Sequence, residues 1–427
     1  MSGLRSHRLR RRQFIKNAAG IALPAALGGF PAILKAENAR PTIRVMGTHV
    51  TLQEELRLRA EKELGINIQF YPGGSAEVLM RATTNPYSFD LYEQWSNSIR
   101  VLWNAGAIQS IDTQRIQYWN EINNLSKTGK ITEDAKIGRG DAPHRLLYVQ
   151  EDNTLGRQTS RNVSFLPYVH NTDSFGYNSR FITPGEPYVT ESWGWLLNKQ
   201  HAGKVAIVNE PTIGIFDLAL AAQAKGLITF RDIGNMSIGE IDQLFDIAID
   251  YKKRGHFRGV WSSVPQSVEL MANNEVIIES MFSPGASALQ GQGIPCIYAA
   301  PKEGYRAWHG VMCLSSQTQG EQEDAAYRFM NWWLSGYPGA FIARQGYYIS
   351  NPERSKQFMS QEEWDYWYAG KPAAMPLKGT DGSISVSEGS IRTGGSYEQR
   401  FSNVAVWNSV MDTYDYTLPK WKEFVLS

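Results

Sequence analysis

The chain has 427 residues, of which 42% are hydrophobic and 20% are charged, and its formal net charge is +1. The first 36 residues carry seven of the 43 basic side chains and none of the 42 acidic ones, so the remainder has a net charge of −6. This acidic balance disfavours nucleic acid and anionic membrane surfaces as partners, because both require a basic face. The remaining roughly 390 residues fit two domains of ordinary size.

The N-terminal segment is typical of an export signal. Its apolar stretch, residues 18–34, is interrupted by glycine and proline and is shorter than the roughly 20 residues of a membrane span. Residues 11–16, RRQFIK, favour a twin-arginine signal, although Arg10 stands where Ser or Thr is usual. An ordinary Sec signal is the alternative. Both routes predict a periplasmic protein cleaved near Ala36, and the first makes the Tat translocase a partner during export.

Strand-like and helix-like patterns alternate from residue 42 onward. The expected strands are 42–46, 66–70 and 89–92, and the expected helices are 52–64, 78–80 and 99–105, with Ser75 as the N-cap of the second. This alternation predicts parallel strands joined by crossover helices. In such sheets the ligand binds beyond the carboxyl ends of the strands.

A second series of elements begins after Pro167. Strands are expected at 174–178, 204–208, 276–278, 297–299 and 311–314, and helices around 216–220 and over 238–252 and 325–334. Residues 378–396 are rich in Gly, Ser and Thr and predict an exposed loop. A final helical stretch is expected at 401–416.

The chain has two cysteines, Cys296 and Cys313, each within a short apolar run. Two cysteines are too few for a zinc site of the usual spacing, and the favoured interpretation is two buried small side chains. The sequence leaves open whether they form a disulfide, which the cell envelope permits. No cofactor or metal ion is expected.

Several short motifs follow one another in a characteristic order. They are FDL at 89–91, GAIQSID at 106–112, LPY at 166–168, GYN at 176–178, SW at 192–193, GKV at 203–205, PKEG at 301–304 before Trp308, and QGY at 345–347 before Asn351-Pro352. In this order they resemble the periplasmic spermidine/putrescine-type solute-binding proteins of ABC importers. The resemblance covers nearly the whole mature chain, and the PKEG segment is its most specific part.

This resemblance implies an α/β fold with two lobes, a type II-like periplasmic-binding-protein fold with the ligand cleft between lobes joined by crossing strands. Lobe one is expected at 37–168 plus about 305–375, lobe two at 169–304, and a C-terminal loop and helices at 376–427 that pack across the hinge. The implied protein is a monomer without catalytic activity. It captures a small polar solute, polyamine-like, zwitterionic or sugar-like, by hinge closure and delivers it to ABC permease subunits.

Polyamine binders of this family surround the methylene chain with rings and place carboxylates at the ammonium groups, because rings attract cations and a desolvated ammonium needs paired charge. Here Trp308 and Phe282 match two aromatic positions and Glu210 lies near a carboxylate position, whereas Gly214 and Gly310 stand where acids are expected. This chain thus keeps some of the family's aromatic residues and lacks some of its acidic residues. The expected ligand-binding residues are Thr48, His49, Ser75, Trp95, Ser96, Asn97, Glu210, Thr212, Trp261, Phe282, Trp308 and His309.

The sequence bears on three other functions. Adjacent tyrosines, Tyr347 and Tyr348, suggest a ferric-ion or other metal-binding transport protein, although neighbours in an extended segment point to opposite sides. An exported hydrolase is disfavoured, because the sequence contains neither a G-x-S-x-G nor an H-E-x-x-H motif. A sensor that docks on a membrane receptor would use the same fold as a transport protein.

Overall fold

The computed structural model describes residues 40–427. The expected export signal, its twin-arginine motif and the cleavage near Ala36 lie outside the described residues. Within residues 40–427, no helix combines the length and the apolar character that a membrane span needs.

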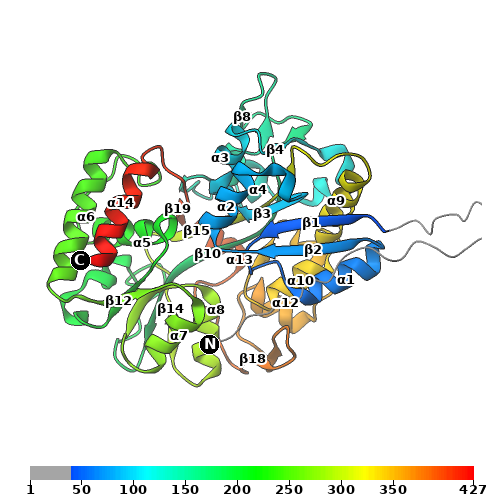
Figure 1. The fold of residues 1–427 in the computed structure, drawn as a ribbon. Helices are drawn as coiled ribbons and strands as arrows, with labels where there is room; N and C mark the ends of the chain where they lie inside the picture. The colour runs from blue at the N-terminus through cyan, green and yellow to red at the C-terminus, as the bar shows by residue number, and fades with distance from the viewer. Residues whose placement is uncertain (1–39) are drawn as a thin grey trace, which may run out of the picture. The chain divides into compact units, whose positions relative to one another are not determined.

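The first half of the molecule is built on three parallel strands in the order β2 (Asn67–Pro72), β1 (Thr42–Gly47) and β3 (Leu91–Trp95). Ile43 and Val45 are fully buried in β1, and such β-branched side chains favour a strand that is covered by helices. Helix α9, from much later in the chain, packs against β1 and α1 (Figure 1). The helices of this half are α1 (Glu54–Leu64), α2 (Ser75–Thr84), α3 (Ile99–Asn104), α9 (Gly320–Trp333) and α10 (Tyr337–Ala343).

The second half repeats this plan with the parallel strands β12 (Phe257–Trp261), β11 (Val205–Val208) and β13 (Ile278–Met281). Its α5 is apolar on nearly every side and is almost wholly buried, as expected of a core helix. Its α6 is amphipathic and begins at a capping box that Ser237 forms with Glu240. The helices of this half are α5 (Pro211–Ala224), α6 (Ile238–Lys253), α7 (Val264–Ala272) and α8 (Ser283–Gly291).

Two long antiparallel strands connect the halves. Strand β10 (Leu166–Asn178) pairs with β13 of the second half, β15 (Tyr305–Ser315) pairs with β3 of the first, and the two strands pair with each other. Their register places Asn171 opposite Trp308 and Asp173 opposite Arg306. Every residue of both strands is buried, so any polar side chain in them requires a partner inside the protein.

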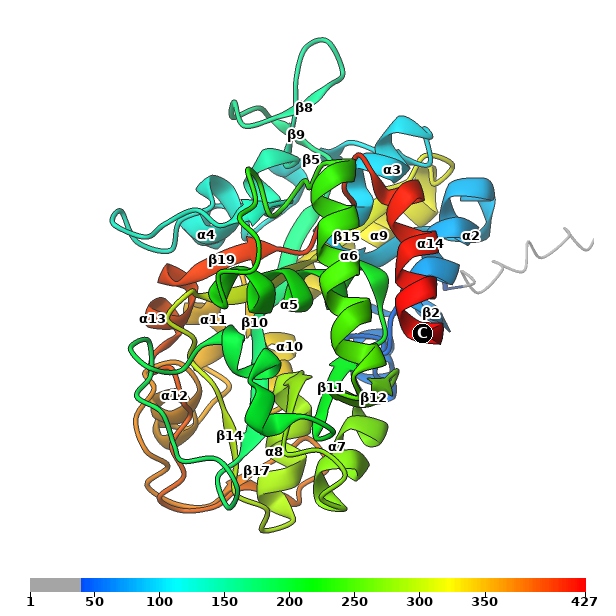
Figure 2. The ribbon, with the colours of Figure 1, turned by 90° about the vertical axis from the view of Figure 1, so that its left-hand side faces the viewer.

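The remaining elements are short, except for the last helix. Helix α14 packs against α5 and α6, beside which it lies in both views (Figures 1 and 2). Among these strands, β4, β6, β14, β16 and β19 belong to the main sheet. The helices are α4 (Asn124–Thr128), α11 (Pro352–Lys356), α12 (Gln361–Trp367), α13 (Tyr397–Ser402) and α14 (Tyr414–Leu426). The strands are β4 (Ile108–Gln109), β5 (Ile111–Asp112), β6 (Arg139–Gly140), β7 (Tyr148–Val149), β8 (Leu155–Gly156), β9 (Asn162–Val163), β14 (Cys296–Tyr298), β16 (Tyr348–Ile349), β17 (Leu377–Lys378), β18 (Ile384–Val386) and β19 (Val404–Trp407).

The α/β prediction and the parallel strands are confirmed, whereas two local predictions are wrong. Residues 404–407 form strand β19 beside β15 rather than part of one helix, because Val404 and Val406 are β-branched and the edge of β15 offers them backbone partners. Ser75 is not an N-cap: α2 begins at Ser75, and Gly74 occupies the cap position without a side-chain bond. Cys296 and Cys313 are both buried free thiols, in hydrophobic clusters of different halves.

One carboxyl group in β3 has a strongly altered acidity. Glu93 is buried, and its Oε2 has no hydrogen-bond partner among the described residues. Burial raises the pKa of Glu93 from 4.5 to about 8. The folded protein therefore keeps the proton over a pH range in which the unfolded chain has lost it.

We expect this group to make stability depend on pH. The free energy of unfolding should fall as the pH rises from about 4.5 to about 8, by about 5 kcal/mol at most, because the unfolded state ionises first. Glu93→Gln removes this dependence, so its stability relative to the wild type should increase between pH 5 and pH 9. Urea unfolding at several pH values measures this difference, with the exposed Glu77→Gln as control. A constant difference between Glu93→Gln and wild type across this range would contradict the assignment.

Candidate ligand-binding site

A small cavity of about 50 Å³ lies where the two halves face each other. It lies beyond the carboxyl ends of β1, β3, β11 and β13, as expected of parallel sheets. Residues of both halves and of the connecting strands enclose it, so a movement of one half relative to the other would open or close it. The lining residues are Val50, Trp95, Trp308 and Tyr347 from the first half and β15, Ile213 and Phe282 from the second half, and Asp173 and Asn408 from the connecting segments.

Four of the eight residues in the cavity wall are aromatic. The ring centroids of Trp95 and Trp308 lie 4.5 Å apart, and those of Trp308 and Tyr347 lie 5.6 Å apart, both pairs edge to face. Phe282 contributes a ring from the second half, and Trp261 packs against it from the core at 5.1 Å. We call Trp95, Phe282, Trp308 and Tyr347 the aromatic box. The tilted rings turn faces and edges toward one small space, an arrangement that suits a cation.

A buried ion-pair network lies beside the box. The Nε of Arg306 donates to Oδ1 of Asp217 at 2.7 Å, and its Nη1 lies 3.4 Å from Oδ2 of Asp173 and 3.3 Å from Oδ1 of Asn408. The Tyr298 hydroxyl donates to Oδ1 of Asp173 at 3.2 Å. Two carboxylates thus share one guanidinium at the edge of the cavity.

Burial shifts the acidity of both carboxyl groups in this network. Desolvation raises the pKa of Asp217 to about 6, and the charge of Arg306 limits the rise. Desolvation also raises the pKa of Asp173, against the opposing effect of Arg306. A positively charged ligand would favour the ionised form of Asp173, which lines the cavity.

The structure brings three of the twelve expected ligand-binding residues into the cavity wall, namely Trp95, Phe282 and Trp308. Others lie directly behind or beside it. Ser75 accepts a hydrogen bond from the Trp95 indole at 3.4 Å, and Trp261 packs behind Phe282. At the start of α5, the Thr212 hydroxyl donates to Glu210 at 2.7 Å, and burial raises the pKa of Glu210.

Five more of the expected residues also lie outside the cavity wall. Ser96 donates to the backbone oxygen of Asp141 at 3.0 Å, and both Asn97 and Thr48 are buried polar side chains outside the wall. His49 is exposed on the loop after β1. The fifth is His309, discussed next.

His309 lies on the opposite face of β15 from Trp308, because successive side chains of a strand alternate. Its ring stacks on His170 at a centroid distance of 4.8 Å, and its Nε2 lies 2.8 Å from the Ser126 hydroxyl. Burial lowers the pKa of His309 to about 4, so the imidazole is neutral near pH 7. In this structure it supports the connecting strands rather than the cavity.

Sequence reasoning missed five wall residues: Val50, Asp173, Ile213, Tyr347 and Asn408. Asp173 could have been predicted from the sequence, because it is an acidic residue within a strand-like run. A buried carboxylate needs a partner or a ligand. Tyr347 enters the sequence prediction only through the QGY motif and the metal-site alternative, and neither predicts a ring in this cavity. Asn408 follows the unforeseen strand β19, so no signal pointed to it.

Two glycines explain why this cavity has few acids. A Cβ on Gly310 would lie 2.7 Å from the backbone oxygen of Val169, and one on Gly214 would lie 2.4 Å from that of Val208 and 2.3 Å from the Trp421 ring. These are the two positions where the resemblance led us to expect acids. Backbone packing leaves no space for any side chain there, so the site must work with other charges.

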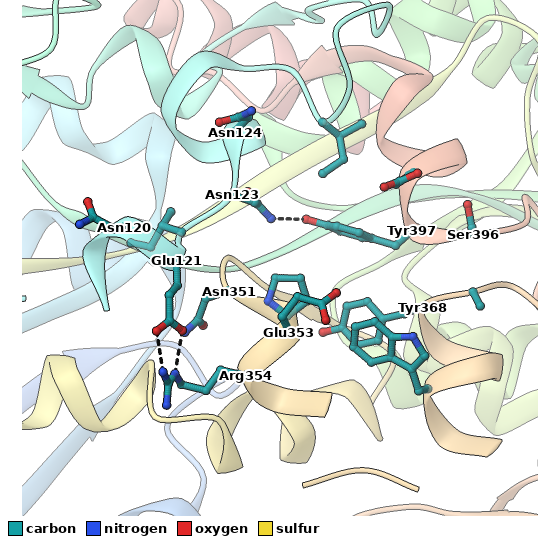
Figure 3. Close-up of a pocket in the computed structure, with 16 residues that line it drawn as sticks. Asn120, Glu121, Asn123, Asn124, Asn351, Glu353, Arg354, Tyr368, Ser396 and Tyr397 are labelled. Atoms are coloured by element: carbon teal, nitrogen blue, oxygen red, sulfur yellow. Dashed lines mark hydrogen bonds and ion pairs between the residues drawn. The ribbon is translucent and has the colours of Figure 1, made fainter. Parts of the chain in front are cut away.

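A second cavity of about 750 Å³ lies against the C-terminal segment (Figure 3). Its wall includes the bidentate ion pair of Arg354 with Glu121, at 2.7 Å for Nε, and the 2.8 Å hydrogen bond from Asn123 to the Tyr397 hydroxyl. None of the twelve expected residues lines it, and neither does any residue of 169–304. A movement between the two halves would therefore not enclose a solute in it.

The adjacent tyrosines do not form a joint site. Tyr347 lines the cavity, whereas Tyr348 is fully buried in a different hydrophobic cluster. Among residues 40–427, no group of three or more His, Cys, Asp or Glu side chains is placed to hold a metal ion.

Comparisons with solved structures show proteins of the same fold. A spermidine/putrescine ABC transporter substrate-binding protein, PotD of Streptococcus pneumoniae, has a TM-score of 0.61 at 14% identity, over 90% of this chain and 99% of that one. A putative spermidine/putrescine ABC transporter from Listeria monocytogenes has a TM-score of 0.63 at 14% identity, over 90% and 98%. The binding protein AgtB of A. tumefaciens R10, in complex with agropinic acid, has a TM-score of 0.53 at 12% identity, over 91% and 99%.

These neighbours are binding proteins with two lobes, and the two halves described above correspond to that fold. No curated protein matches the chain with significance. Residues 61–367 match the family described as bacterial extracellular solute-binding protein. This match covers more than half of the chain, and the family is one of transport binding proteins. The chain belongs to the bacterial extracellular solute-binding proteins.

Proposed function

We propose that this protein captures a small cationic solute between its two lobes and delivers it to the permease subunits of an ABC importer. The observation that carries the proposal is the cavity in which four rings and Asp173 meet at the junction of the halves. The Streptococcus and Listeria neighbours, which are named as spermidine/putrescine transport proteins, support it.

The chemistry of the wall favours a cation over a sugar. Ring faces attract positive charge through their quadrupole. The carboxylates of Asp173 and Asp217 outnumber the single guanidinium of Arg306 beside the cavity, and the charge of Arg306 also acts on Glu210. A sugar would bring many hydroxyl groups to a wall with few polar groups, namely Asp173, Asn408, the Tyr347 hydroxyl and the tryptophan N–H groups, and some of its hydroxyls would be left without partners.

We propose that binding proceeds by hinge closure about the connecting strands. Lobe one would comprise residues 37–168 and about 305–375, lobe two residues 169–304, and residues 376–427 would pack across the hinge. The pairing of β19 with β15 and the packing of α14 on α5 and α6 support this role of the C-terminal segment. A monomer suits this mechanism, because each lobe must move freely.

The solute-binding test compares variants in the two cavities. Trp308→Ala and Asp173→Asn should each weaken binding of the cationic solute by about tenfold or more, because a desolvated cation–π contact or charge pair contributes about 1–2 kcal/mol. Trp364→Ala, in the second cavity, should leave affinity within about twofold. Isothermal titration calorimetry against amines, amino acids, sugars and metal ions measures these constants. Tight binding of a sugar, or loss of binding in Trp364→Ala alone, would refute the assignment.

We further propose export by the twin-arginine route, with cleavage near Ala36 and the mature protein in the periplasm. Replacement of Arg11 and Arg12 by lysine should abolish export through the Tat translocase, because the arginine pair is the recognised part of the signal. Cell fractionation and N-terminal sequencing, with an expected start at Glu37, measure the outcome. Normal export in a strain that lacks the Tat translocase would instead favour the Sec route.

A further inference from the structure

We infer that the solute carries a methylated ammonium group, as in a quaternary ammonium compound, rather than a primary ammonium. This inference rests on the proposed function of the cleft and names the group that the aromatic box holds. Three features of the cavity support it: the aromatic rings, the hydrogen-bond acceptors that are already occupied, and the small volume.

The rings supply the attraction that a methylated ammonium uses. Trp95, Trp308 and Tyr347 meet at centroid distances of 4.5 and 5.6 Å, with interplanar angles of 60° and 66°. Phe282 completes the box from the other half. These three rings contact one another and form a continuous aromatic wall. The methyl groups of a quaternary ammonium can pack against such a wall without losing any hydrogen bond.

The acceptors around the cavity are largely engaged. Asp173 already receives the Tyr298 hydroxyl at Oδ1 and Arg306 at Oδ2, and Oδ1 of Asn408 also lies against Arg306. A primary ammonium has three N–H donors that need acceptors once water is removed. The acceptors in the cavity wall are the carboxylate of Asp173, the amide oxygen of Asn408 and the hydroxyl of Tyr347. Because Tyr298 and Arg306 already engage the first two, few free acceptors are left for three donors.

Other acceptors lie nearby but outside the wall. Glu210 accepts from Thr212, and Thr48 and Asn97 are buried away from the cavity. A quaternary ammonium requires none of them. It needs only negative charge at a short distance, which the two carboxylates around Arg306 supply.

The cavity also selects for shape. At about 50 Å³ it is small against the roughly 300–1,000 Å³ of ordinary ligand pockets, and it is enclosed by residues of both halves. An extended diamine would need a long groove with an acceptor at each end. A compact solute with a single ammonium group needs only the aromatic box.

The test uses pairs of ligands that differ in methylation alone: choline against ethanolamine, and glycine betaine against glycine. In calorimetry with the mature protein, the methylated member of at least one pair should bind at least tenfold more tightly than its primary-amine partner. Saturation-transfer difference NMR should give its strongest signal at the N-methyl protons of that ligand, because those protons contact the rings.

Variants separate the rings from the charge. Trp308→Leu should reduce the preference for the methylated member by about tenfold, whereas Trp308→Phe, which retains a ring, should largely preserve it. Asp173→Asn should weaken both members of a pair by a similar factor, because both carry the same charge. A preference that survives Trp308→Leu unchanged would overturn the role of the box.

The remaining outcomes are distinguishable. If ethanolamine, putrescine or spermidine binds as tightly as choline and glycine betaine, with dependence on Asp173, the inference is overturned and the cationic-solute proposal stands. If no amine of either kind binds while a neutral or anionic solute does, both fall together.

Discussion

The antiparallel pairing of β10 with β15 is the constraint on which the site depends. It places Asp173 opposite Arg306 inside a layer where every residue is buried. A guanidinium in such a place must be paired, and Arg306 finds Asp217 on α5 of the second half as well as Asp173. One buried cation therefore ties the connecting strands to a helix of the second half and sets the charge of the neighbouring cavity.

The same strands distribute side chains between two environments. Alternation places Trp308 in the cleft and His309 against His170 and Ser126 on the other face. It separates Tyr347, in the cleft wall, from Tyr348, in a hydrophobic cluster. Residues that are adjacent in the sequence thus serve unrelated purposes, and the metal-site interpretation of the tyrosine pair loses its geometric basis.

The charge of the cleft depends on the acidic side chains that the packing excludes as well as on those that are present. Backbone atoms of Val169 and Val208 fill the space that side chains at Gly310 and Gly214 would need. With acids excluded at those positions, Asp173 is the carboxylate that lines the cavity, and its acceptors are partly occupied by Tyr298 and Arg306. Because of this packing, the site has several aromatic rings and few free hydrogen-bond acceptors. This imbalance is the reason for preferring a methylated ammonium.

The sequence by itself determined the α/β alternation, most element positions and the two cleft tryptophans, because periodicity and the ends of strands are local properties of the chain. It also indicated the family, through motifs spread from residue 89 to 352. Only the tertiary structure decided that Asp173 and Asn408 meet the box, that residues 404–407 form a strand, and that His309 faces away. Those outcomes depend on the register between strands about 100 residues or more apart in the sequence, which no local pattern encodes.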